Sequence, residues 1–207
     1  MPVERGYVVL TPESEERIVG ALLSGLEPLR DAGKMGALLL QLSPAFSPGK
    51  HALEELDSLR ALLDGHALAV ELRNRDWVSG ERLDATLAYL RERRISFVMV
   101  DAPDHEHFTI MPGLNAVTNP ALAYFRAHGR NARGYISGRS VAERFDYDYS
   151  DAEVDDIAAR LQQVEPEVSA LHIVANNNRS SYAPKLAERL ARKLAPPRIP
   201  TRKDELF

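Results

Sequence analysis

The sequence predicts an α/β protein in which about five β-strands form one parallel sheet, and three observations support this class. Short apolar runs recur along the chain, and most are separated by segments with apolar residues at helical spacing. Each run also ends in polar, chemically capable residues, and ligands of parallel sheets gather at the carboxyl ends of the strands. The predicted strands occupy residues 37–41, 67–73, 95–101, 121–128 and 170–175.

Helix signals surround these runs. Thr11 and Pro12 form a helix start, a capping hydroxyl followed by proline at the first position, and Gly33 ends that helix. Ser150 and Glu153 form a capping box at the start of another helix. The remaining helices are predicted over residues 51–63, 80–93 and 184–194. Two segments without periodicity, residues 102–120 and 131–149, are predicted as long strand-top loops.

Length and composition are those of one soluble domain. The 207 residues are 44% hydrophobic and 27% charged, which predicts a single domain over residues 1–195 and a proline-rich charged tail over residues 196–207. The net charge of -4 gives no general attraction to nucleic acid or to anionic membranes. Absence of cysteine excludes thiol catalysis and disulfides. With no long apolar run and no signal peptide, we expect a cytoplasmic protein without a membrane partner.

Two architectures compete for these elements. A five-stranded doubly wound parallel sheet fits the length well. A (β/α)8 barrel needs three more β-α units and typically about 250 residues. Composition and periodicity alone therefore favour the open sheet.

Five motifs in fixed order change this balance. They are GALLLQLSPAF at residues 36–46, AVELRNRDW at 69–77, YFRAHGRN at 124–131, FDYDYSDAEV at 145–154 and VANNNRSSYAPKLAERL at 174–190. With them, the sequence from about residue 33 to 194 resembles the YecE-like family, the domain-of-unknown-function group numbered 72. The resemblance implies a TIM-type (β/α) barrel with a polar pocket at the strand tops and no established activity.

The resemblance also implies that the barrel is incomplete. Members usually begin with a glycine-rich first strand and a second strand bearing an acidic residue and an asparagine, and neither occurs here. The chain therefore resembles the last five β-α units, with Met1 an internal start or a fragment boundary. If the chain is complete as given, open sheet edges lead us to expect a homodimer.

Alternation along strands groups the candidate site residues. Glu71 and Arg73 share one face of their strand, as Arg126 and His128 share one face of theirs. In a barrel, the inward face at the strand tops would gather Gln41, Glu71, Arg73, Asp101, Arg126, His128 and Asn176. The acids and arginines in this cluster nearly balance in charge.

This cluster has two interpretations. As a functional site, Glu71, Asp101 and His128 are candidate catalytic acid-base groups, or hard ligands for a divalent metal ion, the one cofactor that we consider. Arg73 and Arg126 would then hold anionic oxygens of a substrate. As a structural feature, the cluster is a buried ion-pair network in which Glu71 balances the arginines.

Further residues beside the strand ends are candidates for substrate binding, each with a structural alternative. The indole of Trp77 could stack on a sugar or base, or could cover the rim of the core. Gly129 allows close backbone approach to a ligand, or simply forms a turn. Tyr147 could wall the pocket or anchor a loop. The remaining candidates are Asn74 and Arg130, with Asn176 and Asn177 as amides for a polyhydroxylated ligand.

Three functions remain open. The first is a hydrolase or lyase acting on a small phosphorylated or sugar-like substrate, with Glu71 or Asp101 as base and His128 as acid. The second is a nucleic-acid-processing barrel that uses the arginine-rich segment 126–144 on phosphates. The third is a non-catalytic protein that binds a small anionic or polyhydroxylated ligand. The sequence contains no standard phosphate-binding motif that would decide among them.

Overall fold

The computed structural model describes residues 3–4, 7–8, 11–138, 140–177 and 179–194. The tail predicted over residues 196–207 lies outside these described residues. Near the N-terminus, β1 (Val3–Glu4) and β2 (Tyr7–Val8) pair as a small antiparallel hairpin.

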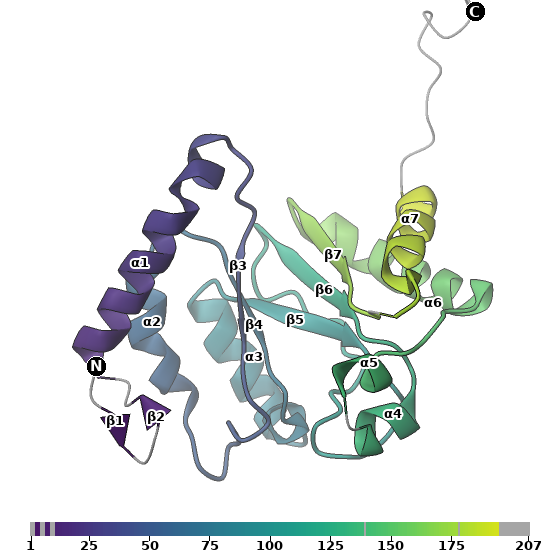
Figure 1. Cartoon of the computed structure of the whole chain (residues 1–207), viewed down its shortest axis with the longest axis horizontal. Helices are drawn as coiled ribbons and strands as arrows, with labels where there is room; N and C mark the ends of the chain where they lie inside the picture. Colours follow the sequence, from purple (N-terminus) through teal and green to yellow (C-terminus); the bar gives the residue numbers. More distant parts are fainter. Residues whose placement is uncertain (1–2, 5–6, 9–10, 139, 178, 195–207) are drawn as a thin grey trace, which may run out of the picture.

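The main sheet has five parallel strands, as the apolar runs predict. They are β3 (Leu38–Gln41), β4 (Leu68–Glu71), β5 (Ser96–Asp101), β6 (Ala123–Ala127) and β7 (Leu171–Ala175). Their spatial order is β3-β4-β5-β6-β7, the order of the chain. The sheet curls into an incomplete α/β barrel (Figure 1). A doubly wound sheet reverses its strand order at a switch point, and no such reversal occurs among the described strands.

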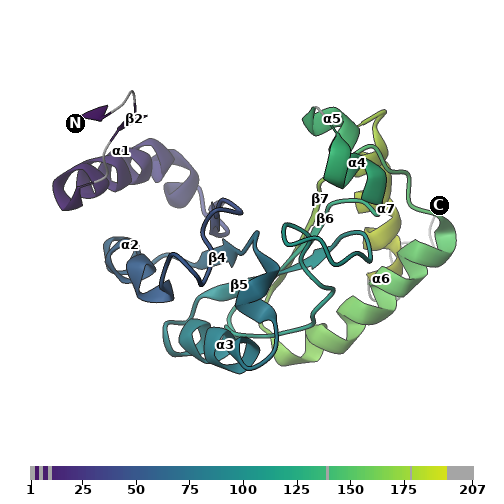
Figure 2. The same cartoon turned by 90° about the horizontal axis from the view of Figure 1, so that it is seen from below.

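Helices surround the outer face of the curled sheet, with α3 and α6 running along it (Figure 2). The longer helices are α1 (Pro12–Asp31), α3 (Arg82–Glu92), α6 (Asp151–Val164) and α7 (Tyr182–Leu194). The short ones are η1 (Leu53–Leu56), α2 (Asp57–Leu62), η2 (Arg75–Val78), α4 (Ala132–Ser137), α5 (Val141–Arg144) and η3 (Glu165–Glu167). Both predicted caps are confirmed: Thr11 caps α1, and Ser150 forms a capping box with Glu153 at α6.

Two predictions of local structure differ from the fold. Residues 51–63 form a 3₁₀ turn followed by a short α-helix instead of one continuous helix. Residues 131–149, predicted as a loop, contain α4 and α5. The Asn131 side chain caps α4 by accepting a hydrogen bond from the Gly134 N–H at 2.9 Å. Helices of one or two turns are too short to produce a detectable apolar period.

Burial differs between the middle and the edges of the sheet. Every residue of β4 and β5 is buried, because these strands have neighbours on both sides. The edge strands β3 and β7 are only partly buried. None of the described helices combines the length and the apolar character that a membrane span requires.

Candidate functional site

The polar cluster lies on the concave face of the curled sheet. Parallel pairing aligns Gln41 with Glu71, and Arg126 with Val174, so side chains at aligned positions share a face. Arg126 Nη1 on β6 donates to Gln41 Oε1 on β3 at 2.6 Å. Two strands separate β3 from β6, and side chains can meet across them only on the inner side of the curl. The site is therefore inside the incomplete barrel, at the strand ends.

Three buried side chains, Glu71, Arg126 and His128, form a closed ring of hydrogen bonds with the half-buried Asn176. Arg126 donates through Nη1 to Glu71 Oε2, and through Nη2 to Asn176 Oδ1 at 3.0 Å. The Asn176 Nδ2 donates to His128 Nδ1 at 3.0 Å. The circuit closes because His128 Nε2 lies 3.1 Å from Glu71 Oε1. The ring is formed by four of the seven residues of the predicted cluster, and its carboxylate, Glu71, is 0% exposed.

The ring also fixes the protonation of its members. Since His128 Nδ1 accepts from the Asn176 amide, the imidazole proton must be on Nε2, where it is donated to Glu71. Burial lowers the pKa of His128 more than the Glu71 carboxylate raises it, so the imidazole is neutral. Burial raises the pKa of Glu71, but its hydrogen bond to His128 and the charges around it lower that pKa further, so the carboxyl is ionised. The positive charges of Arg126 and Arg73 are among the causes that lower this pKa.

Three hydrogen-bond donors beside this ring remain available. Arg73 makes one long contact, from Nη1 to Glu71 Oε1 at 3.4 Å, and its other N–H groups have no partner among the described residues. The Gln41 amide nitrogen and the Tyr135 hydroxyl likewise have no partner in the described part of the chain. Tyr135 is close enough for the charges of Arg73, Glu71 and Arg126 to affect its pKa, which burial raises. The site therefore offers unpaired donors and a net positive charge.

Comparison with known proteins places this fold in a family. The family model described as "Protein of unknown function DUF72" matches residues 8–205. The chain belongs to the DUF72 family. No curated protein matches its sequence.

Two solved DUF72 structures illustrate the similarity. A family protein of Enterococcus faecalis V583 is 30% identical, with a TM-score of 0.79, and the match covers 87% of this chain and 66% of the relative. A family protein of Thermotoga maritima MSB8 is 28% identical, with a TM-score of 0.76, and the match covers 86% of this chain and 65% of the relative. The chain thus spans a little less than two thirds of the length of these relatives.

Asp101 of this DUF72 chain is separate from the ring, in contrast to the cluster predicted from the sequence. It aligns with Ala127, one position away from Arg126, and so lies on the opposite face of the sheet. There Arg130 binds it in a bidentate manner, with Nη2 at 2.7 Å from Oδ1 and Nε at 3.0 Å from Oδ2. The Tyr149 hydroxyl donates to it at 2.7 Å. The structure therefore does not bring Asp101 and Arg130 to the Glu71 site.

The two candidates that follow β4, Asn74 and Trp77, form packing and hydrogen-bond contacts within the fold. Trp77 is buried, its indole N–H donates to the Phe46 carbonyl at 2.8 Å, and the two rings stack at 5.3 Å. The Asn74 side chain accepts from the Asp76 N–H and donates to the Pro44 carbonyl. These contacts correspond to the structural alternative for Trp77, a cover on the rim of the core.

A third group anchors the segment after β6. Gly129 has φ +93°, and an added Cβ would lie 2.7 Å from the Tyr147 Cβ, so the close approach is to Tyr147. The Asn177 amide donates to the Tyr147 carbonyl at 2.9 Å. Burial raises the pKa of Tyr147 to about 12. Gly129, Tyr147 and Asn177 thus hold one another in place.

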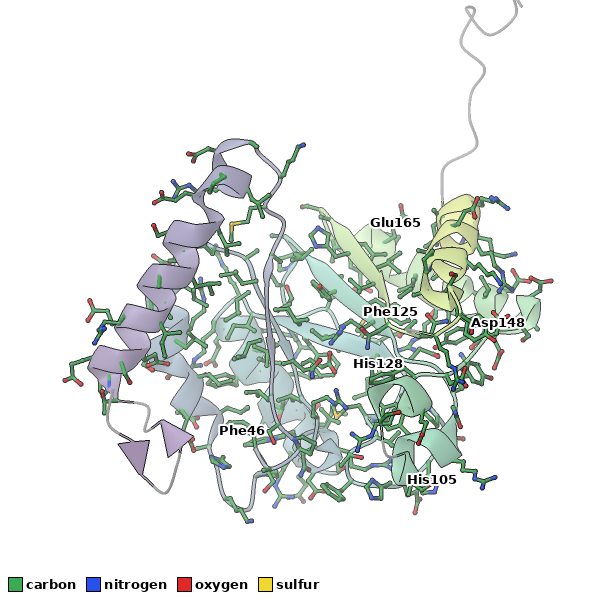
Figure 3. All side chains as sticks on the ribbon, in the orientation of Figure 1. Phe46, His105, Phe125, His128, Asp148 and Glu165 are labelled. Atoms are coloured by element: carbon green, nitrogen blue, oxygen red, sulfur yellow. The ribbon has the colours of Figure 1, made fainter. Side chains whose placement is uncertain are left out.

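Sequence reasoning missed two aromatic residues of the DUF72 site. Phe145 stacks on His128 at 5.4 Å, and Tyr135 meets Phe145 edge-on at 5.7 Å. His128 lies where β6 ends, beside the α4–α5 segment that carries Tyr135 (Figure 3). The aromatic motif around Phe145 is the one signal in the sequence that could have indicated the role of Phe145. No signal indicates the role of Tyr135, because it lies in a segment without periodicity.

The donor set does not fit a metal ion. Among the described residues, no three His, Asp or Glu side chains gather as ligands. Glu71 and His128 are adjacent, but Arg73 and Arg126 surround the carboxylate and would repel a cation. This cluster therefore favours an anion.

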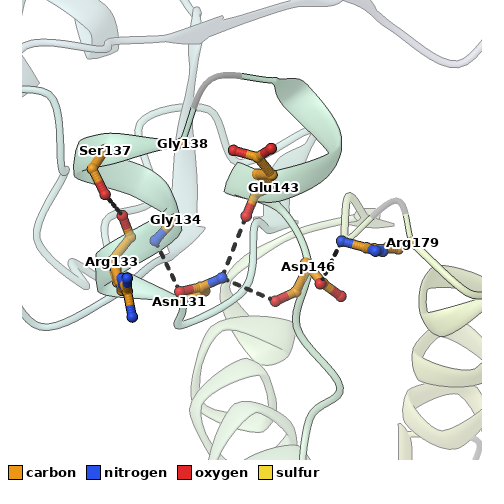
Figure 4. A pocket seen from close by; sticks show the side chains of 8 residues that line it. All are labelled: Asn131, Arg133, Gly134, Ser137, Gly138, Glu143, Asp146 and Arg179. Carbon is orange, nitrogen blue, oxygen red and sulfur yellow. Dashed lines mark hydrogen bonds and ion pairs between the residues drawn. The ribbon is translucent and has the colours of Figure 1, made fainter.

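A separate surface pocket lies between α4, α5 and the turn before α7 (Figure 4). Its volume is about 470 Å³, and its walls include Arg133 and the ion pair between Arg179 and Asp146 at 2.8 Å. The Asn131 amide closes its inner side by donating to the carbonyls of Glu143 and Asp146. Because none of the predicted site residues lines it, this pocket is distinct from the Glu71 ring.

Proposed function

We propose that the concave strand-top face binds a small ligand through an oxyanion group, such as a carboxylate or a phosphate. The observation that carries this proposal is the Arg73 guanidinium. It keeps most of its donors unpaired, and it lies beside a ring whose four members form hydrogen bonds with one another. A planar guanidinium matches carboxylate and phosphate oxygens in charge and in geometry.

Electrostatics support the same ligand class. Two arginines and one carboxylate surround the site, and the imidazole of His128 is neutral, so the local charge is positive. The free groups are the Arg73 guanidinium, the Gln41 amide nitrogen and the Tyr135 hydroxyl, all of which can donate. An anion supplies the acceptors that such a set lacks.

The test is a calorimetric titration that measures the binding of inorganic phosphate and of a small carboxylate. Arg73→Gln should weaken binding by roughly 10- to 150-fold, the effect of losing one charge-assisted interaction of about 1.5–3 kcal/mol. Arg91→Gln, at an exposed residue of α3, is the matched control and should bind as the wild type does. Equal anion affinity of the Arg73→Gln variant and the wild type would refute the proposal.

A second candidate is hydrolase or lyase chemistry on a small phosphorylated or sugar-like substrate. The specific observation in its favour is the buried Glu71–His128 pair, since perturbed acid-base groups concentrate at functional sites. Asp101 is committed to Arg130 and Tyr149, so Glu71 is the better base. His128 could act as acid only after Asn176 releases its Nδ1.

Turnover assays distinguish this candidate from simple ligand binding. We expect Glu71→Gln to abolish turnover of an artificial phosphomonoester or glycoside if the wild type hydrolyses it. Anion binding without any turnover would instead identify a non-catalytic ligand-binding protein.

Two of the arginines on which the nucleic-acid hypothesis depends are paired within the fold. Arg126 belongs to the ring, and Arg130 binds Asp101 and Asp156. Both charges are therefore neutralised within the fold. Steep salt dependence of DNA or RNA binding would revive this hypothesis.

A further inference from the structure

Asn176 holds two groups of the ring through the two ends of one amide. Its Oδ1 accepts from Arg126 Nη2, and its Nδ2 donates to His128 Nδ1, each at 3.0 Å. Asn176 comes directly after β7 and is half-buried, whereas Arg126 and His128 are buried. The orientation of this amide therefore determines what the guanidinium and the imidazole can each bind.

The observed orientation fits only a neutral imidazole. If His128 takes up a proton from solvent, both ring nitrogens become donors, and the new N–H on Nδ1 faces the N–H₂ group of Asn176. A half-turn of the amide about its Cβ–Cγ bond exchanges Oδ1 and Nδ2 and restores a hydrogen bond to His128. The same half-turn removes the acceptor from Arg126 Nη2.

The turned amide creates a position for an oxyanion. Arg126 Nη2 then faces the Asn176 N–H₂ group, so two donors point toward each other without an acceptor between them. Arg126 Nε already has no partner among the described residues. A buried donor without a partner is costly, and more so when it is charged. One oxygen of an anion between the two groups accepts from both.

The charges around His128 make the anion and the proton stabilise each other. Burial opposes the charged imidazole most; Arg126 on β6 and Arg73 after β4 add to this, whereas the Glu71 carboxylate on β4 favours it. With the imidazole neutral, two arginines and one carboxylate leave an excess positive charge, and a proton on His128 increases it. A bound oxyanion offsets this excess.

The neighbours of His128 on α4, on β5 and after α5 bring no charge to it. The imidazole stacks on Phe145, which meets Tyr135 edge-on, and burial raises the pKa of Tyr135, so that hydroxyl keeps its proton. The main-chain carbonyl of Asp101 accepts from the His128 N–H at 2.8 Å. The Asp101 carboxylate binds Arg130 on the opposite face.

We propose that Asn176 is a positioning residue that couples anion binding at the concave face to the uptake of one proton by His128. The inference rests on the proposed anion site at Arg73. In the anion-bound ring the amide is turned, the imidazole is charged, and an anion oxygen takes the place of Oδ1 beside Arg126. Because linkage is reciprocal, acid strengthens anion binding, and the anion favours the proton.

The first experiment is a calorimetric titration of the wild type with sodium sulfate between about pH 5 and pH 8, around the ordinary titration range of histidine. Sulfate stays a dianion over this range, whereas phosphate titrates within it. The affinity should rise as the pH falls, by at most about tenfold for each pH unit, the limit for uptake of one proton. Titrations in two buffers of different ionisation enthalpy should show proton uptake on binding. Absence of uptake throughout this range would overturn the proposal.

Two histidine variants form a matched pair for this titration. His128→Gln offers a donor toward Glu71 and an acceptor toward Asn176 but takes up no proton, so its sulfate affinity should lose this pH dependence. His172→Gln changes a half-buried residue of β7 on the same face, outside the ring, and should keep it. Equal pH dependence in His128→Gln and the wild type would contradict the assignment of the proton to His128.

The variant Asn176→Asp tests the amide itself. A carboxylate accepts from Arg126 Nη2 and from a protonated Nδ1 at the same time, without a half-turn. His128 should therefore be charged without any anion, and NMR titration of its ring should show a higher pKa than in the wild type. Sulfate should bind this variant weakly and with little pH dependence. An unchanged His128 titration would show that Asn176 does not control the proton.

The outcomes also separate this coupling from the anion site. Sulfate binding that requires Arg73 but is independent of pH would overturn the coupling and leave the anion site intact. Equal sulfate affinity of Arg73→Gln and the wild type would refute the anion site and the coupling together.

Discussion

Replacing Glu71 by glutamine should strongly destabilise the protein, because the change removes the acceptor on which the ring depends. In the wild type, Arg126 donates to one carboxylate oxygen, and His128 and Arg73 donate to the other. A glutamine offers one oxygen and turns an N–H₂ group toward the remaining donors. At least one buried donor would then lose its partner, and the Arg126 charge would lose its counter-ion.

The magnitude follows from the burial of these groups. Glu71 is fully buried, and the side chain of Arg126 is only 10% exposed. Breaking a buried ion pair by removing one partner costs about 3–5 kcal/mol. For a chain of this size, each kcal/mol lowers the melting temperature by about 2–4 °C, so we expect a decrease of roughly 6–20 °C.

The assay is urea denaturation and thermal unfolding followed by circular dichroism. Glu54→Gln, at an exposed glutamate of η1, is the control and should change stability by less than about 0.5 kcal/mol. The variant Glu71→Met with Arg126→Met should be destabilised less than the sum of the single changes, since neither charge is left unpaired. A loss below about 1 kcal/mol for Glu71→Gln would refute the interpretation of the ring as a coupled network.

Three further outcomes are expected. Burial holds the pKa of His128 below its ordinary 6.5. The stability that the neutral imidazole contributes is therefore complete above pH 6.5 and is lost as the pH falls. His128→Gln should flatten the acid side of a stability–pH profile. Gly129→Ala should lose about 1–3 kcal/mol in denaturant titrations, because φ is +93° and the new Cβ would meet Tyr147; an unchanged midpoint would contradict this. Tyr149→Phe should lower stability without changing anion affinity in calorimetry, because the Tyr149 hydroxyl donates a hydrogen bond to Asp101 and accepts one from the Gly129 N–H. Tyr135→Phe should instead weaken anion binding without changing stability, because the Tyr135 hydroxyl has no partner among the described residues.

Local patterns predicted the framework of the site correctly. The apolar runs predicted the five strands. The alternation of side chains along a strand predicted that Glu71 shares a face with Arg73, and Arg126 with His128. Both signals act over a few residues, because the period of a strand is two and depends on no distant contact. The capping signals at Thr11 and Ser150 are local for the same reason.

The same patterns could not place Asp101. Its strand is buried on both faces, so its apolar run carries no alternation that would distinguish the concave side from the helix side. The register with β6 decides the matter, since Asp101 pairs with Ala127 and not with Arg126. A shift of one residue would have brought the carboxylate into the ring.

The sequence by itself thus determined the five β-α units, the strand-top location of the polar residues and the resemblance to a barrel family. The tertiary structure alone decided which polar groups are committed to one another and which remain free. It closed the ring of Glu71, His128, Asn176 and Arg126, left Arg73 with spare donors, and brought Tyr135 to the site from a short helix. Hydrogen-bond partners separated by about 50 residues depend on how the sheet curls and on strand register, and neither is encoded in a local period.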